Sequence, residues 1–169
     1  MATPTNPSGA SRASHKSRRK PVVSHRPQDG HPVTWWRIVP PCFLNEPERL
    51  YLDKALKGLA VFGGGQDLAA ALAGDPAAAV AAALSLVPLR EITLKADIAM
   101  SALLSCALQD DPAAMLVMSH ILGRAQWGDP SAEDLGLAWL DRHTAFPMDR
   151  EQFAVSEAAL AAAFCRGEQ

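Results

Sequence analysis

Cys106 and His120 are the two side chains of this sequence with the most obvious capacity for chemistry. Each lies in an apolar stretch, and the turn Asp110-Asp111-Pro112 joins the two stretches. If both stretches are helices packed as a hairpin, the thiol and the imidazole could approach each other. A histidine base can activate a cysteine nucleophile. A small enzyme that uses Cys106 and His120 is therefore one hypothesis for the function.

The surroundings of both residues favour a non-catalytic role. Cys106 is embedded among the apolar residues Leu103, Leu104, Ala107 and Leu108. A free cysteine in such company behaves as a small apolar residue. His120 has no companion at the helical spacing of a metal site, and it lies one turn before Arg124. We expect no catalytic residue, and we expect His120 and Arg124 to face solvent or a partner protein.

No cofactor or metal motif is recognisable. The triple glycine at 63–65 follows a predicted helix and lacks the Lys-Ser/Thr of a phosphate-binding loop, so we interpret it as a helix end. The three cysteines are far apart and form no CxxC pair. The histidines of the first 33 residues, with Cys42, have irregular spacing. We expect neither a metal nor a cofactor.

Residues 1–33 form a basic, low-complexity segment. Its six basic residues and one acid give a net charge of +5, whereas ten basic and 17 acidic residues give −7 from residue 34 onward. The basic residues are Arg12, Lys16, Arg18, Arg19, Lys20 and Arg26. Because the segment offers little apolar surface, we expect a disordered arm. It could bind nucleic-acid phosphates, lie over its own acidic domain, or only aid solubility.

Residues 34–44 contain the aromatic residues Trp35, Trp36 and Phe43 around the pair Pro40-Pro41. Proline excludes a helix through the middle, so we predict an extended strap. The strap is too apolar to stay in water. It packs along the helical domain, or it docks on a partner protein, since tryptophan is enriched at binding hot spots.

The remainder, residues 45–166, is predicted to be an all-α domain, a compact bundle of about six or seven short helices. Alanine and leucine dominate, and β-branched residues are sparse. Asn45, Asp75 and Asp111 are suitable residues for helix starts. The predicted helices cover 45–62, 66–73, 77–87, 90–108, 112–125 and 132–143, and a last helix follows Pro147. Residues 96–125 are apolar on nearly every face, so we expect them at the centre of the core.

Asp-Pro recurs at 75, 111 and 129, with gaps of 36 and 18 residues that are near the period of helical-hairpin repeats. Residues 113–143 resemble one hairpin of the tetratricopeptide or Sel1-like class through Leu116, Gly123 and the run 138–140. The aromatic and small residues of that class are mostly missing. Asp-Pro is also a common helix start, so the sequence assigns no family.

These features lead to one expectation and two alternatives. We expect a soluble, cytoplasmic, non-catalytic interaction or regulatory domain that contacts another protein through Trp35, Trp36 and Phe43, through His120 and Arg124, or through both. The sequence shows no export signal and no apolar run of about 20 residues that could span a membrane. The alternatives are nucleic-acid binding by the basic arm and catalysis by Cys106 with His120.

Overall fold

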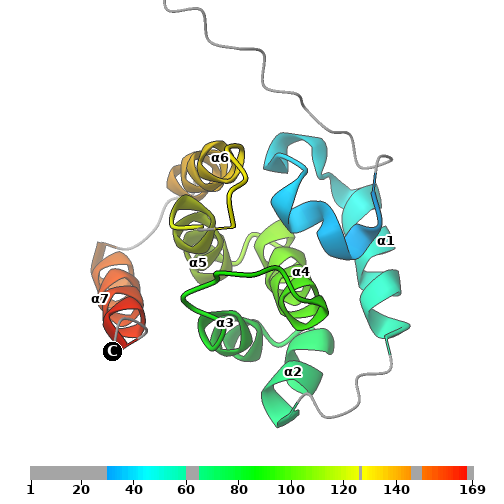
Figure 1. Cartoon of the computed structure of the whole chain (residues 1–169), viewed down its shortest axis with the longest axis horizontal. Helices are drawn as coiled ribbons and strands as arrows, with labels where there is room; N and C mark the ends of the chain where they lie inside the picture. The colour runs from blue at the N-terminus through cyan, green and yellow to red at the C-terminus, as the bar shows by residue number, and fades with distance from the viewer. Residues whose placement is uncertain (1–29, 60–64, 126, 146–149, 167–169) are drawn as a thin grey trace, which may run out of the picture.

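The protein folds into an all-α bundle, as the sequence predicts. The computed structural model describes residues 30–59, 65–125, 127–145 and 150–166 (Figure 1). Within these ranges the secondary structure is entirely helical, with two short 3₁₀ helices and seven α-helices. They are η2 (Pro32–Arg37), η3 (Pro41–Phe43), α1 (Glu46–Lys57), α2 (Gly65–Leu72), α3 (Pro76–Leu84), α4 (Leu94–Leu108), α5 (Pro112–Gly123), α6 (Ala132–Thr144) and α7 (Arg150–Arg166).

Side-chain caps explain where several helices begin. Asp75 accepts a hydrogen bond from Ala78 N at 3.0 Å, and Asp111 accepts one from Ala114 N at 2.8 Å. Each cap precedes a proline at the first helical position, where the missing N–H costs nothing. Thr93 caps α4 in the same way, at 3.2 Å from Ala96 N. That cap sets the start of α4 at Leu94, four residues later than the sequence suggested.

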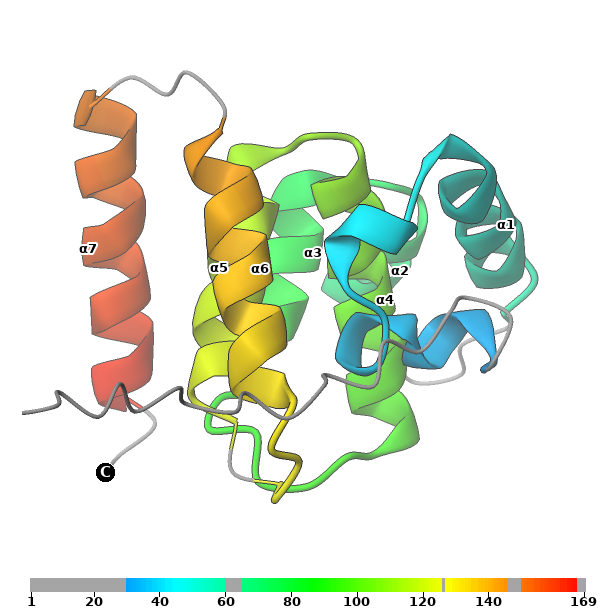
Figure 2. The ribbon, with the colours of Figure 1, turned by 90° about the horizontal axis from the view of Figure 1, so that it is seen from above.

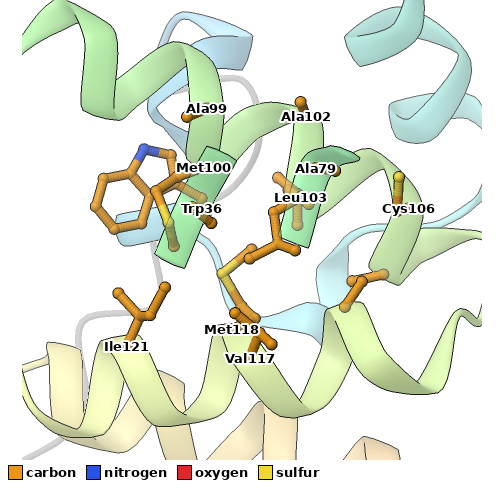
Figure 3. Packing of buried hydrophobic residues seen from close by; sticks show 14 of the residues in the cluster. Trp36, Ala79, Ala99, Met100, Ala102, Leu103, Cys106, Val117, Met118 and Ile121 are labelled. Carbon is orange, nitrogen blue, oxygen red and sulfur yellow. The ribbon is translucent and has the colours of Figure 1, made fainter. Parts of the chain in front are cut away.

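Helix α4 is the centre of the bundle. Every residue from Ala96 to Leu108 is buried, and α4 packs against α1, α2, α3, α5 and η2. Figure 3 shows apolar side chains of α4 interleaved with those of α5, including Leu103 and Met118. The prediction that residues 96–125 form the centre of the core is confirmed, because α5 is also buried from Ala114 to Ser119. A helix apolar on all sides is stable only when neighbours cover it completely.

The segment at 34–44 is not an extended strap, and that part of the prediction is wrong. It forms η2 and η3, each with proline at a first helical position, because proline favours a helix start as well as extended chain. Its aromatic residues explain the compact form. Trp36 is fully buried, and its ring meets that of Trp127 edge-on at 5.4 Å between centroids. The segment belongs to the core of the same chain.

Polar contacts fix this segment to α4. Trp36 Nε1 and Arg37 Nε both donate hydrogen bonds to Asp97 Oδ1, at 2.9 and 3.1 Å. Ser101 Oγ donates to the carbonyl of Val33 at 2.8 Å. The buried carboxylate of Asp97 therefore has both a charged and a neutral donor, which is the condition under which burial of an acid is tolerated.

Helices α6 and α7 both pack against α5 on the side away from α4. Helix α5 lies between the central helix α4 and the outer pair, with α6 on one side of it and α7 on another (Figures 1 and 2). Leu160 of α7 is buried, whereas Glu157 and Cys165 of the same helix are exposed. Among the described helices none is both long and apolar enough to cross a membrane.

Candidate functional site

The structure does not bring Cys106 and His120 together. Cys106 lies near the end of α4, beside the start of α5, whereas His120 lies near the end of α5. Figure 3 shows Cys106 and Ile121, the neighbour of His120, at opposite ends of the packed pair. Burial, with smaller effects from Asp111 and two other carboxylates, raises the pKa of the Cys106 thiol to about 11. A thiol that stays protonated at neutral pH is a poor nucleophile.

The aromatic residues predicted to contact a partner do not share one surface. Trp35 and Trp36 are buried within the fold, which fits the intramolecular alternative. Phe43 is 37 % exposed on η3. For the two indoles to reach a partner, η2 would have to leave α4 and break the hydrogen bonds to Asp97.

His120 and Arg124, in contrast, both line a groove where α5 meets α6. The groove has a volume of about 290 Å³. Its lining residues come from the second half of α5, the residue that ends it and one face of α6: Ser119, His120, Gly123, Arg124, Glu133, Gly136, Leu137 and Leu140. Leu137 is 55 % exposed. Both apolar and charged side chains therefore line the groove.

Gly136 sets the distance between the two helices. A Cβ atom at this position would lie 2.8 Å from the backbone nitrogen of Gly123 and 2.9 Å from the carbonyl oxygen of Ser119. Only glycine fits at this crossing, because the opposing atoms are backbone and cannot move aside. The close approach determines which residues of α6 line the groove.

Helix α7 contributes an aromatic side chain beside the groove. The guanidinium carbon of Arg124 lies 4.3 Å from the centre of the Phe164 ring, a cation–π contact. The imidazole of His120 is 6.3 Å from the same ring, centre to centre. Phe164 thus favours orientations of Arg124 that place its guanidinium over the ring.

The imidazole of His120 is uncharged near neutral pH. Burial lowers the pKa of His120, and the positive charges of Arg124 and His143 lower it further, while Glu157 opposes them. Burial also lowers the pKa of His143. Arg124 is therefore the charged donor of the groove, and neutral His120 can supply one ring N–H.

A second hollow, of about 190 Å³, lies between α1, α2 and α4. Asp53 there accepts hydrogen bonds from Ser105 Oγ and, at 2.8 Å, from Arg49 Nη1. Gln109 Nε2 donates to the carbonyl oxygen of Ser105 at 3.2 Å. Because these polar groups satisfy one another, the network is structural.

The other predicted residues have separate outcomes. The basic residues Arg12, Lys16, Arg18, Arg19, Lys20 and Arg26 lie outside the described residues. Within the described part of the chain, no three His, Cys, Asp or Glu side chains gather as metal ligands would.

Sequence reasoning missed Glu133, Gly136 and Leu137. The glycine inside a predicted helix was the available signal, since such a residue often marks a close backbone approach.

Comparison with known proteins adds no assignment. No protein-family model, no curated protein and no solved structure matches this chain. The geometry of the groove is therefore the basis on which a function is proposed.

Proposed function

We propose that this protein is a non-catalytic interaction domain and that its partner protein binds in the groove between α5 and α6. The observation that carries the proposal is the groove itself, which places the exposed side chain of Leu137 beside the charged rim of Arg124 and Glu133. Protein interfaces combine an apolar centre with a polar rim in this way.

The size of the groove favours a peptide over a cofactor. Its volume of about 290 Å³ is at the lower limit for sites that enclose small molecules. It suits one or two side chains of a partner whose remaining contacts lie on the surrounding helix surfaces.

The test is capture of partner proteins from extracts of the cells that make this protein, with Leu137→Asp as the informative variant. Leu50→Asp is the matched control, because Leu50 is also 55 % exposed but lies on α1. We expect Leu137→Asp to remove the captured partner and Leu50→Asp to retain it. The opposite pattern would place the interaction on α1 and contradict the proposal.

The cytoplasm is the proposed compartment. Cys42 and Cys165 are exposed and free, and exposed thiols persist where the environment is reducing.

Nucleic-acid binding by residues 1–33 is the second candidate function. It is favoured by the charge difference between that segment, at +5, and the rest of the chain, at −7. Binding of this kind would depend on phosphate charge and not on base sequence.

A further inference from the structure

We infer that the α5–α6 groove recognises a carboxylate on a partner peptide, and that Arg124, held by Phe164, is the residue that binds it. This inference rests on the proposed function and specifies the chemistry of the partner: an apolar side chain with an acidic residue near it.

Arg124 has donors to offer. The guanidinium carbon lies over the Phe164 ring, 4.3 Å from the ring centre. A cation–π contact with a ring occupies no oxygen acceptor, so the N–H donors of the guanidinium remain available for a carboxylate. Arg124 is exposed, and within the described ranges its guanidinium makes no hydrogen bond and no ion pair, since only its backbone N–H donates, to Leu122 O. Two N–H donors on one side of a guanidinium match the two oxygens of a carboxylate.

Phe164 also reduces the conformational entropy that Arg124 loses when a partner binds. An arginine side chain free in water has many rotamers, and binding must fix one of them. The contact with Phe164 restricts the guanidinium before the partner arrives. His120, against the same ring at 6.3 Å, adds an imidazole whose ring N–H is a further donor.

The groove has room for the apolar part of the peptide. The small residues Ser119, Gly123 and Gly136 line it together with Leu137 and Leu140. A side chain seated there would cover Leu137, which is 55 % exposed in the free protein. Burying it would add a hydrophobic contribution to the carboxylate contact.

The rim limits which acidic peptides fit. Glu133 also lines the groove and has no ion-pair partner among the described residues. It would repel a peptide that carries only negative charge and would attract a basic side chain. The expected partner therefore carries one acidic and one basic residue around an apolar residue.

The experiment uses the full-length protein labelled with ¹⁵N and a family of blocked, alanine-based helical peptides. The parent peptide carries one glutamate, two leucines one turn apart and one lysine. Its variants replace the glutamate by glutamine, the lysine by glutamine, or both leucines by alanine. We expect the parent peptide to shift the amide signals of Gly123, Arg124 and Leu137. Affinity should fall about tenfold when glutamate becomes glutamine, as for loss of a charged hydrogen bond.

Variants of the protein locate the contact. Arg124→Gln should weaken the parent peptide about tenfold and leave the glutamine peptide unchanged, whereas Arg90→Gln, at another exposed arginine, should alter neither. Arg124→Lys keeps the charge but loses the planar fork, so it should restore binding only in part. Phe164→Leu keeps an apolar side chain and removes the cation–π contact, and should weaken the glutamate peptide alone.

Three outcomes would overturn the inference. If the glutamine and glutamate peptides bind the groove equally, the groove still binds helices and only the carboxylate inference fails. If the shifts map to α1, or if no peptide binds at millimolar concentration, the inference fails as well. The capture experiment with Leu137→Asp then decides separately whether the proposed function fails with it.

Discussion

The indole N–H of Trp36 donates a hydrogen bond of 2.9 Å to Oδ1 of Asp97, although the two residues are 61 positions apart in the chain. The same oxygen accepts from Arg37 Nε at 3.1 Å. One buried carboxylate therefore connects η2 to the central helix α4, and replacing it gives the most direct test of the fold.

Replacing Asp97 by alanine should lower the free energy of unfolding by about 3 kcal/mol, because Trp36 loses a charged acceptor and its indole N–H is left buried without one. Asp97→Asn retains an acceptor oxygen and should cost less. Urea unfolding followed by tryptophan fluorescence measures both values. Equal stability of the alanine variant and the wild-type protein would show that η2 is not held to α4 as described.

Gly136→Ala should destabilise the protein by about 1–3 kcal/mol, because the added methyl group meets backbone atoms of α5 that cannot move aside. Gly123→Ala is the matched control. Nothing lies within 4 Å of a Cβ at Gly123, so that change should be neutral or stabilise the helix by up to about 1 kcal/mol. Thermal unfolding of the two variants under one set of conditions provides the comparison.

Two of the three cysteines should react rapidly with a thiol reagent in the native protein. Cys42 and Cys165 are exposed, whereas Cys106 is buried and its pKa is raised to about 11. The third cysteine, Cys106, should react with the reagent only after the protein is denatured. Cys106→Ser should leave the native count at two, and rapid reaction of Cys106 in the folded protein would restore the catalytic hypothesis.

Stability should fall as the pH drops below about 6.5. Burial lowers the pKa of His120 below its usual value of 6.5, so the unfolded chain binds a proton more readily than the folded one. Well above pH 6.5 both states are neutral at this site, and the histidine does not affect stability. Between 6.5 and the lower folded pKa, each step toward acid favours unfolding, and below the folded pKa the loss is complete.

The measurement is the urea midpoint at pH 7.5 and at pH 5.5 for the wild-type protein and for His120→Gln. The difference between the two midpoints should be smaller in the variant. His143, whose pKa burial also lowers, contributes in the same direction, so some dependence should remain. A dependence of the same size in both proteins would show that His120 titrates normally.

The basic arm provides a separate prediction. If it binds nucleic acid, full-length protein should bind labelled duplex DNA and RNA at low salt, and affinity should fall steeply by physiological salt. A variant in which glutamine replaces Arg12, Lys16, Arg18, Arg19, Lys20 and Arg26 should not bind. No binding by the wild-type protein at low salt would leave this candidate function without support.

The helical core was predictable because its signals are local. Asp75-Pro76 and Asp111-Pro112 each provide a cap and a favourable first residue, and both open helices as expected. The unbroken apolar run of α4 could be buried only by helices on all sides. The end of α1 was less predictable. It ends at Lys57, before the triple glycine, because the chain turns at Gly58.

The segment at 34–44 and the groove depend on contacts between distant parts of the chain. Proline at 40 and 41 indicates a break, but it does not determine that η2 forms, since that depends on Trp36 packing against Trp127 and Asp97. His120 and Arg124 could be selected as a polar stripe of one helix. That Leu137 of α6 lies beside them depends on the close crossing at Gly136, which no periodicity within α5 or α6 reveals.

The bond between Trp36 and Asp97 also has a consequence for how the protein is made. The ribosome produces the chain from the N-terminus, so both tryptophans of η2 leave the exit tunnel well before α4 exists to cover them. During that interval two large apolar rings are exposed to water and to other nascent chains. Trp36 packs on α4 and also on Trp127, which follows α5, so its burial is complete only after the chain has been made beyond residue 127.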